Sequence, residues 1–179
     1  MGRIRELSLL LSFMLWPGAL GAAALRPDET PRAGKEALPV PAPSVPSARH
    51  ALRIFARLNE GFERIYWERD PTLVPRFLSE DGPMYPVALA EVDQLRHDRV
   101  RSRTRFMSKG LQVGELRRRS FVVRERLLLI PRFLDRTGVD ITTSEPLVQK
   151  VRWTIVRRHG RWVIHNVFLE VSRVARVKA

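Results

Sequence analysis

Two polar residues, Glu125 and His165, lie on otherwise apolar faces of predicted strands. Glu125 alternates with Val123 and Leu127, and His165 alternates with Val163 in the same way. If the two apolar faces line one pocket, a carboxylate and an imidazole meet there. Burial moves the pKa of each group toward neutrality, so the pair is suited to general acid–base catalysis.

Both residues also have a purely structural explanation. A single histidine in a strand is commonly a satisfied core or edge residue. Glu125 lies between Arg124 and Arg126, which point to the opposite strand face, and a cross-strand ion pair with another arginine would satisfy its carboxylate. The sequence alone leaves the catalytic and structural interpretations open.

Clustered arginines form a second candidate site. The chain carries a net charge of +13, nearly all of it in residues 48–179, and only four of its 32 basic residues are lysine. Guanidinium groups bind phosphates and carboxylates through two parallel hydrogen bonds, so an anion-binding surface is one interpretation and a solvated basic surface is the other. The candidate anion-binding residues are Arg96, Arg99, Arg103, Arg117, Arg118 and Arg119.

Two aromatic residues, Tyr66 and Trp153, are candidate ligand contacts. Trp153 and Trp162 fall in two neighbouring β-rich runs, where aromatic side chains ordinarily stabilise a sheet and can also stack on a ligand.

Several chemistries are excluded or receive no support. The chain has no cysteine, which excludes disulfides, thiolate nucleophiles and cysteine-ligated zinc. Asp93 and His97 have the spacing of two ligands on one helix face, but no third ligand accompanies them. No zinc-protease, P-loop or serine-hydrolase motif occurs. We therefore expect no metal and no cofactor.

Three helices are expected to precede the strands. The first begins at the N-cap Ser47 and ends before Asp70, which caps a shorter helix that starts at Pro71. A third helix is predicted over residues 87–101. Alternating residues predict strands at 121–129, 151–156 and 162–169, the last two forming a hairpin around Gly160.

Helices followed by a curved antiparallel sheet predict an α+β fold with the helices on one face of the sheet. The first helix, the Asp70-Pro71-Thr72-Leu73-Val74 segment and the Gly160-Arg161-Trp162-Val163-Ile164 ending resemble the NTF2-like (cystatin-like cone) superfamily. The run Val123-Arg124-Glu125-Arg126 is similar to exported members with an N-terminal tether, of the intermembrane-space (IMS) type or VirB8-like. The resemblance implies a cone-shaped sheet, a fold that serves enzymes, binders and scaffold subunits alike.

The N-terminal region indicates export. Residues 1–24 combine Arg3 and Arg5 with an apolar run and a small-residue ending at Ala24, which is typical of a cleaved signal peptide. An uncleaved membrane anchor is the alternative. Residues 25–47 hold six of the thirteen prolines and are expected to be an extended linker, which leaves residues 48–179 as the folded domain.

The expected function is therefore a non-catalytic binding or assembly module, exported to the periplasm or cell envelope. Its expected partner is an envelope protein or an anionic surface, since export removes nucleic acid as a physiological partner. One alternative is a pocket enzyme or small-molecule binder that uses Glu125 and His165. Another is a VirB8-like subunit of an envelope secretion complex, which would form a homodimer through the sheet.

Overall fold

The computed structural model describes residues 44–175, in which helices precede a sheet as the sequence predicts. Helix α2 (Ala48–Glu68) begins after Ser47, whose hydroxyl accepts a hydrogen bond of 3.2 Å from the amide of His50. The N-terminal boundaries predicted at residues 24 and 47 concern a region that lies largely outside the described residues, and they stay predictions.

The two shorter helices differ from their predicted bounds. The segment capped by Asp70 folds as a 3-10 turn, η1 (Pro71–Leu73), and one α-helical turn, α3 (Val74–Phe77). Helix α4 (Met84–His97) begins and ends earlier than the predicted 87–101. Pro86 fits the first turn, where amide donors have no helical partner, and the left-handed backbone of Arg99 stops the helix.

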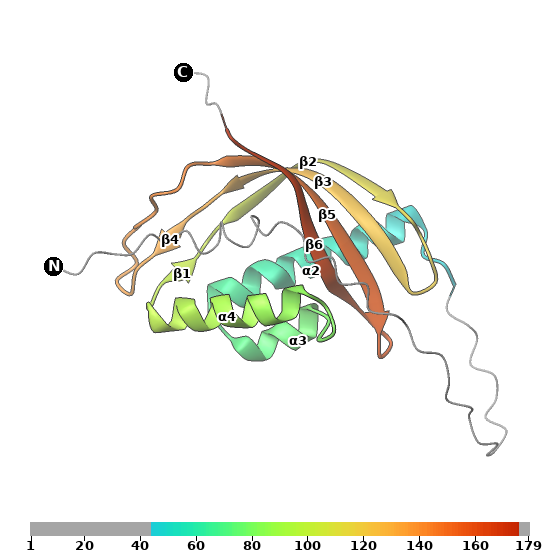
Figure 1. Cartoon of the computed structure of the whole chain (residues 1–179), viewed down its shortest axis with the longest axis horizontal. Coiled ribbons are helices and arrows are strands. Elements are labelled where there is room, and N and C mark those ends of the chain that lie inside the picture. Colours follow the sequence, from blue (N-terminus) through green and yellow to red (C-terminus); the bar gives the residue numbers. More distant parts are fainter. Residues whose placement is uncertain (1–43, 176–179) are drawn as a thin grey trace, which may run out of the picture.

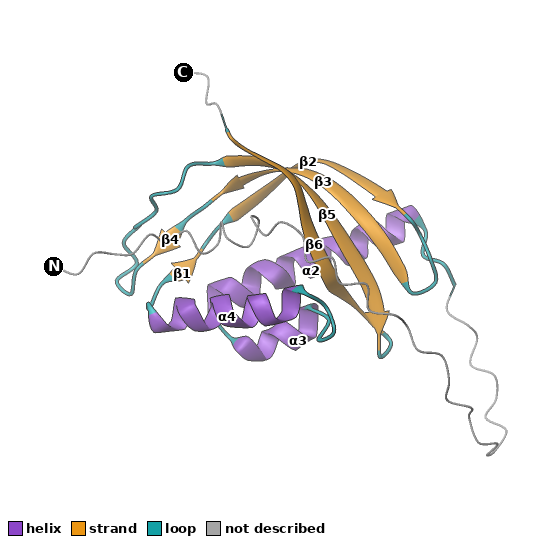
Figure 2. Ribbon diagram, viewed as in Figure 1, coloured by secondary structure: helices purple, strands orange, loops and turns teal. Residues whose placement is uncertain are grey.

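Four antiparallel strands in the order β2-β3-β5-β6 form the main sheet. Their bounds are β2 (Arg105–Gly114), β3 (Ser120–Ile130), β5 (Leu147–Arg158) and β6 (Arg161–Val174). The two-residue strands β1 (Arg101–Ser102) and β4 (Phe133–Leu134) pair beside it. Figure 1 shows the sheet arching over the helices, and Figure 2 shows all three helices on its inner side.

Of the four strands of the main sheet, β2 is the one that the sequence did not predict, and the short strands β1 and β4 were not predicted either. The pattern of β2 is irregular because the pairing with β3 shifts between Ser108 and Gly110, which leaves Lys109 as an extra residue. As an edge strand, β2 also has most of its side chains exposed, so no apolar alternation marks it. The predicted hairpin at Gly160 is present, with His159 and Gly160 both at positive φ, as a tight two-residue turn requires.

The core lies between the helices and the inner face of the sheet. It joins the apolar stripe of α2 to alternate residues of β3, β5 and β6. Within residues 44–175, no helix combines the length and apolarity needed to cross a membrane.

Candidate functional site

Glu125 lies on the inner face of the sheet, as its alternation predicts. It pairs in register with Val151 of β5 and is 4% exposed. Its Oε2 accepts a hydrogen bond of 3.0 Å from Nε1 of Trp153. Burial raises the pKa of Glu125, while hydrogen bonds from Ser108 and Trp153 oppose that rise. The carboxyl group thus has a protein partner within the core.

Trp153, a predicted ligand contact, is a core residue. Its ring is 1% exposed and meets Phe55 and Phe62 edge-on, at centroid distances of 5.5 and 5.8 Å. Trp162 stands on the neighbouring strand, as expected, but packs against Phe121 instead, at 5.2 Å. Edge-to-face aromatic contacts stabilise a core beyond their buried area, so the geometry assigns Trp153 a structural role.

Tyr66, the other predicted ligand contact, is also buried. Its side chain hydrogen-bonds Glu91 of α4, and its ring lies 5.2 Å from that of Phe62. Burial raises the pKa of Glu91 to about 8, because an ionised carboxylate loses hydration inside the core. The Tyr66–Glu91 pair is therefore a second polar contact enclosed in the core, which the sequence did not indicate.

The alternation that predicted a common face for His165 and Glu125 is interrupted at His165. The register between β5 and β6 pairs Thr154 with Asn166 and Ile155 with Ile164, so His165 is the extra residue of a β-bulge. The extra residue of a bulge changes the direction of the side chain there. It also shifts the in-and-out alternation of the following residues by one position. Sequence alternation could not reveal this, because the bulge exists only in the pairing.

The side chain of His165 lies beside the turn that follows α3. A Cβ added at Gly82 would collide with the carbonyl oxygen of His165 and crowd its Nδ1, so glycine is required for the close approach. Nδ1 is buried and stands 3.7 Å from Oδ1 of Asp81, which is beyond hydrogen-bond length. The predicted Glu125–His165 pair is therefore not assembled in this structure.

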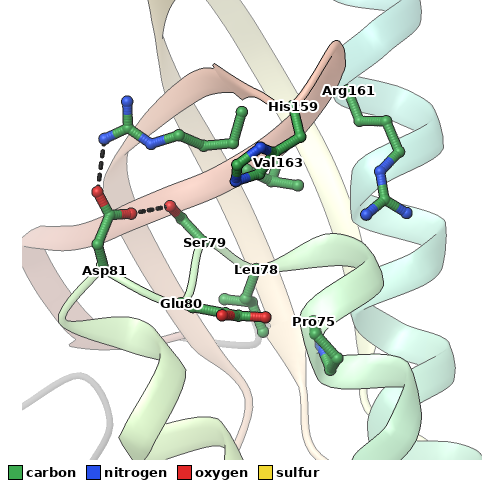
Figure 3. A pocket seen from close by; sticks show the side chains of 9 residues that line it. Pro75, Leu78, Ser79, Glu80, Asp81, His159, Arg161 and Val163 are labelled. Atoms are coloured by element: carbon green, nitrogen blue, oxygen red, sulfur yellow. Dashed lines mark hydrogen bonds and ion pairs between the residues drawn. The ribbon is translucent and has the colours of Figure 1, made fainter.

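Asp81 organises a small polar cluster next to a cavity of about 380 Å³ (Figure 3). Its carboxylate accepts hydrogen bonds from the hydroxyl of Ser79 and, at 2.6 Å, from a guanidinium nitrogen of Arg158. These bonds lower the pKa of Asp81 to about 2, the contact with Ser79 having the larger effect. In a serine-hydrolase triad the histidine lies between serine and aspartate, whereas here the aspartate lies between Ser79 and His165.

The face of the sheet turned away from the helices, here called the outer face, carries unbalanced positive charge. In the register of β3 with β5, Arg124 stands directly opposite Arg152 and Arg126 directly opposite Lys150. Like charges in directly opposed positions destabilise a sheet. We call these four residues the cation block.

Few anions compensate the cation block. Within residues 44–175 its one ion pair joins Arg124 to Glu115, at 3.8 Å on the rim. The guanidinium of Arg152 lies 5.2 Å from the ring centroid of Phe168, and its Nε is buried without a hydrogen-bond partner. A hollow of about 290 Å³ adjoins the block, lined in part by Arg126, Lys150 and Arg173. The sequence held a signal for this site. Arg124 and Arg126, and likewise Lys150 and Arg152, are two residues apart, so each pair lies on one face of its strand.

The predicted anion-binding arginines fall into two separate groups. Arg96 of α4 forms an ion pair of 3.8 Å with Asp93, and Arg103 stacks on Trp67 in the last turn of α2. Arg99 follows α4, whereas the exposed residues 117–119 occupy the β2–β3 turn at the opposite end of the sheet (Figure 1). The six arginines therefore do not form one patch.

The comparisons with known proteins concern the fold. No protein-family model matches the sequence, and no curated protein matches it. The intermembrane-space region of the chloroplast protein ARC6 superposes with a TM-score of 0.54 at 12% identity, covering 69% of this chain and 95% of that one.

Two further solved structures are similar at lower scores. An uncharacterized protein with a cystatin-like fold from Caulobacter vibrioides has a TM-score of 0.45 at 10% identity, covering 70% of this chain and 89% of that one. Aln2 from a Streptomyces species has a TM-score of 0.44 at 16% identity, covering 71% and 93%. The α+β arrangement predicted from the sequence, with helices on one face of a curved antiparallel sheet, is confirmed by the order of the elements and by the superposition on the ARC6 region, and at 12% identity this likeness concerns the fold alone.

Proposed function

We propose that this protein is a non-catalytic binding module of the cell envelope that docks an acidic protein surface on the outer face of its sheet. The observation that carries the proposal is the cation block. Four cations face one another in pairs across two central strands, with a single rim carboxylate as ion-pair partner within the described residues. Such an arrangement costs stability in the isolated protein, and that cost is removed when carboxylates of a partner lie between the rows.

The shape of the outer face favours a protein partner over a membrane. The sheet is convex on this side (Figure 1), so a flat bilayer would touch only its crest, whereas an acidic groove can follow both rows. Exposed Phe168 and Met107 lie on the same face and add apolar contacts to the charged ones. Aromatic residues, methionine and arginine are enriched in protein interfaces.

The same charges disfavour self-association through this face. A two-fold dimer brings each patch against its own copy, so the cation block of one chain would meet that of the other. A homodimer through the sheet, expected of a VirB8-like subunit, would therefore need counter-ions at its centre.

A binding role also agrees with the separation of Glu125 and His165, the two residues that the sequence offers as a catalytic pair. Glu125 is paired with Trp153 in the core, while His165 lies at the edge beside Asp81. General acid–base chemistry requires both groups within reach of one substrate.

The proposed location rests on the N-terminal sequence. Residues 1–24 have the order of a secretory signal peptide, and the proline-rich residues 25–47 would form an extended segment that precedes the domain. The similar ARC6 structure is an intermembrane-space region, which agrees with an extracytoplasmic setting.

The test compares two double variants of the full-length chain that lose the same charge. Arg124→Gln with Arg152→Gln removes half of the cation block, and Arg49→Gln with Arg57→Gln removes two exposed cations of α2. Binding to poly-glutamate is measured by titration calorimetry at low and moderate salt. We expect the first variant to bind poly-glutamate roughly tenfold more weakly, because it loses about the free energy of two exposed ion pairs. The second variant should bind nearly as well as the parent.

Equal losses in the two variants would mean that only net charge matters and would overturn the proposal. Phosphatidylglycerol vesicles serve as the second probe. Tighter binding to these vesicles than to poly-glutamate would replace the acidic protein with a membrane surface.

A further inference from the structure

Four arginines from three separate segments line one cleft of about 390 Å³. Arg69 follows the end of α2, Arg99 follows the end of α4, Arg101 belongs to β1, and Arg136 lies in the turn after β4. The pairing of Arg101 with Leu134 brings these segments together. We call this group the arginine cleft. Strands β1 and β4, which contribute Arg101 and Leu134 to its lining, lie at the left of Figure 1.

The cleft lacks the anions needed to balance its cations. Within residues 44–175, none of its four guanidinium groups forms an ion pair or a hydrogen bond. The Nε of Arg69 is buried without a partner. Buried donors are nearly always satisfied in folded proteins, so this N–H group is available to an acceptor that enters the cleft.

The single carboxylate among the lining residues is already engaged. Oδ1 of Asp135 accepts hydrogen bonds from the amides of Thr137 and Val139, at 2.8 and 2.9 Å, and from the Thr137 hydroxyl, at 2.6 Å. These bonds lower the pKa of Asp135, the Thr137 side chain having the largest effect. Asp135 shapes the turn that presents Arg136 and forms no ion pair with the four arginines, so its single negative charge leaves the lining with an excess of positive charge.

Two of the arginines occupy an unfavourable backbone conformation. Arg69 and Arg99 have φ values of 55° and 56°, in the left-handed region that glycine adopts at helix ends without strain. A glycine at either position would relieve the backbone, yet the chain places a long cation there. Strained backbone of this kind is concentrated at ligand sites.

Trp67 contacts one of the four arginines of the cleft, Arg101. The guanidinium groups of Arg101 and Arg103 each lie 5.5 Å from the centroid of its ring. A cation held against an aromatic face loses less freedom when it binds an anion, so Trp67 is a positioning residue for Arg101.

From these observations we infer that the arginine cleft binds a phosphomonoester, as its dianion. A carboxylate offers two oxygens and one charge, whereas a phosphomonoester offers three terminal oxygens and up to two charges to convergent guanidinium groups. This inference is separate from the acidic partner of the outer face, because no residue of the cation block lines the cleft.

The probes are inorganic phosphate, glycerol phosphate and methyl sulfate, each titrated into the full-length chain by calorimetry. We expect saturable binding of one phosphate or glycerol phosphate per chain, and binding of methyl sulfate at least tenfold weaker, because it carries one charge. Phosphate affinity should fall between pH 7.5 and pH 5, since the second pKa of a phosphomonoester is about 6. The arginines stay charged and the pKa of Asp135 lies below this range.

The decisive variant is Arg99→Gly, which removes a ligand while relieving the backbone, so the chain should stay folded. We expect phosphate binding at least tenfold weaker, with a thermal midpoint equal to or above that of the parent. His159→Gly, which relieves a similar positive φ elsewhere, and Arg57→Gln, which removes a distant charge, are the controls and should bind like the parent. Unchanged phosphate binding in Arg99→Gly, or an equal loss in Arg57→Gln, would overturn the inference.

The source of the phosphomonoester is distinguished with vesicles that contain phosphatidate. Binding to glycerol phosphate alone indicates a soluble ligand, and binding to the vesicles as well indicates a lipid headgroup. Absence of saturable binding to every phosphate probe would overturn the inference and leave the outer-face proposal intact. The variant Arg124→Gln with Arg152→Gln should bind phosphate normally, so the two sites can fail independently.

Discussion

Adjacent residues of β3 lie in opposite environments on the two faces of the main sheet. On the inner face, Glu125 is buried and accepts a hydrogen bond from Trp153. On the outer face, its neighbours Arg124 and Arg126 are exposed and oppose other cations across the strand pair. The inner-face carboxylate of Glu125 has a partner within the protein, whereas the cations of the outer face have few partners within the described residues. The difference indicates that the inner face maintains the fold and the outer face is available for binding.

The largest loss of stability is expected when a positive charge is placed on the inner face. We expect Glu125→Arg to reduce the free energy of unfolding by about 3–5 kcal/mol, because it buries an unpaired cation beside Trp153. The neighbouring Arg124→Glu should change it by less than about 1 kcal/mol, because the site is exposed and the new carboxylate faces Arg152. Urea unfolding measures both, and equal effects of the two variants would contradict the contrast.

The second prediction concerns the buried Glu91. Its pKa is about 8 in the folded chain and about 4.5 when unfolded, so unfolding releases a proton between these pH values and stability falls as pH rises. Glu91→Gln should raise the free energy of unfolding by roughly 1–3 kcal/mol at pH 7 and give no gain at pH 4. Urea unfolding from pH 4 to pH 8 tests this, and a parent chain whose stability does not fall over that range would count against it.

A smaller effect is expected at the edge of the sheet. The pKa of Asp81 is lowered to about 2, so its contribution to stability is present above pH 4 and lost as pH falls through 2. The Asp81 side chain is 58% exposed, so Asp81→Asn should cost only about 0.5–1 kcal/mol at pH 7. The cost should disappear near pH 2, and thermal unfolding at the two pH values measures it. A loss of the same size at pH 2 would show that the carboxylate charge is not its cause.

The smallest stability change is expected on the outer face itself. Replacing Arg152 by glutamine removes its repulsion with Arg124 and should leave the free energy of unfolding unchanged or slightly higher, by roughly 0.5 kcal/mol. The same variant should bind poly-glutamate more weakly. A clear loss of stability would indicate that the cation block supports the fold, in conflict with a binding role.

The sequence predicts what depends on local pattern. The alternation around Glu125 places it on the inner face correctly, and Ser47 and Gly160 mark a helix start and a hairpin turn that the structure confirms. Each of these features is set by residues close together in the chain, so one sequence is sufficient to find it.

What the sequence does not predict depends on pairing between distant residues. The bulge at His165 exists only in the register of β6 with β5, and the opposition of Arg124 to Arg152 only in that of β3 with β5. The arginine cleft likewise needs the pairing of β1 with β4 to bring its segments together. Composition indicates an excess of arginine but not where arginines converge.

The most direct test of the binding role of the outer face is a nuclear magnetic resonance titration of the full-length chain with poly-glutamate. The side-chain Nε–H signals of Arg124, Arg126 and Arg152 report on the outer face, and the indole N–H of Trp153 reports on the inner face. We predict that the arginine signals shift as the peptide binds and that the indole signal stays in place. Shifts at the α2 arginines Arg49 and Arg57 without shifts in the cation block, or a shift of the Trp153 indole, would contradict the account.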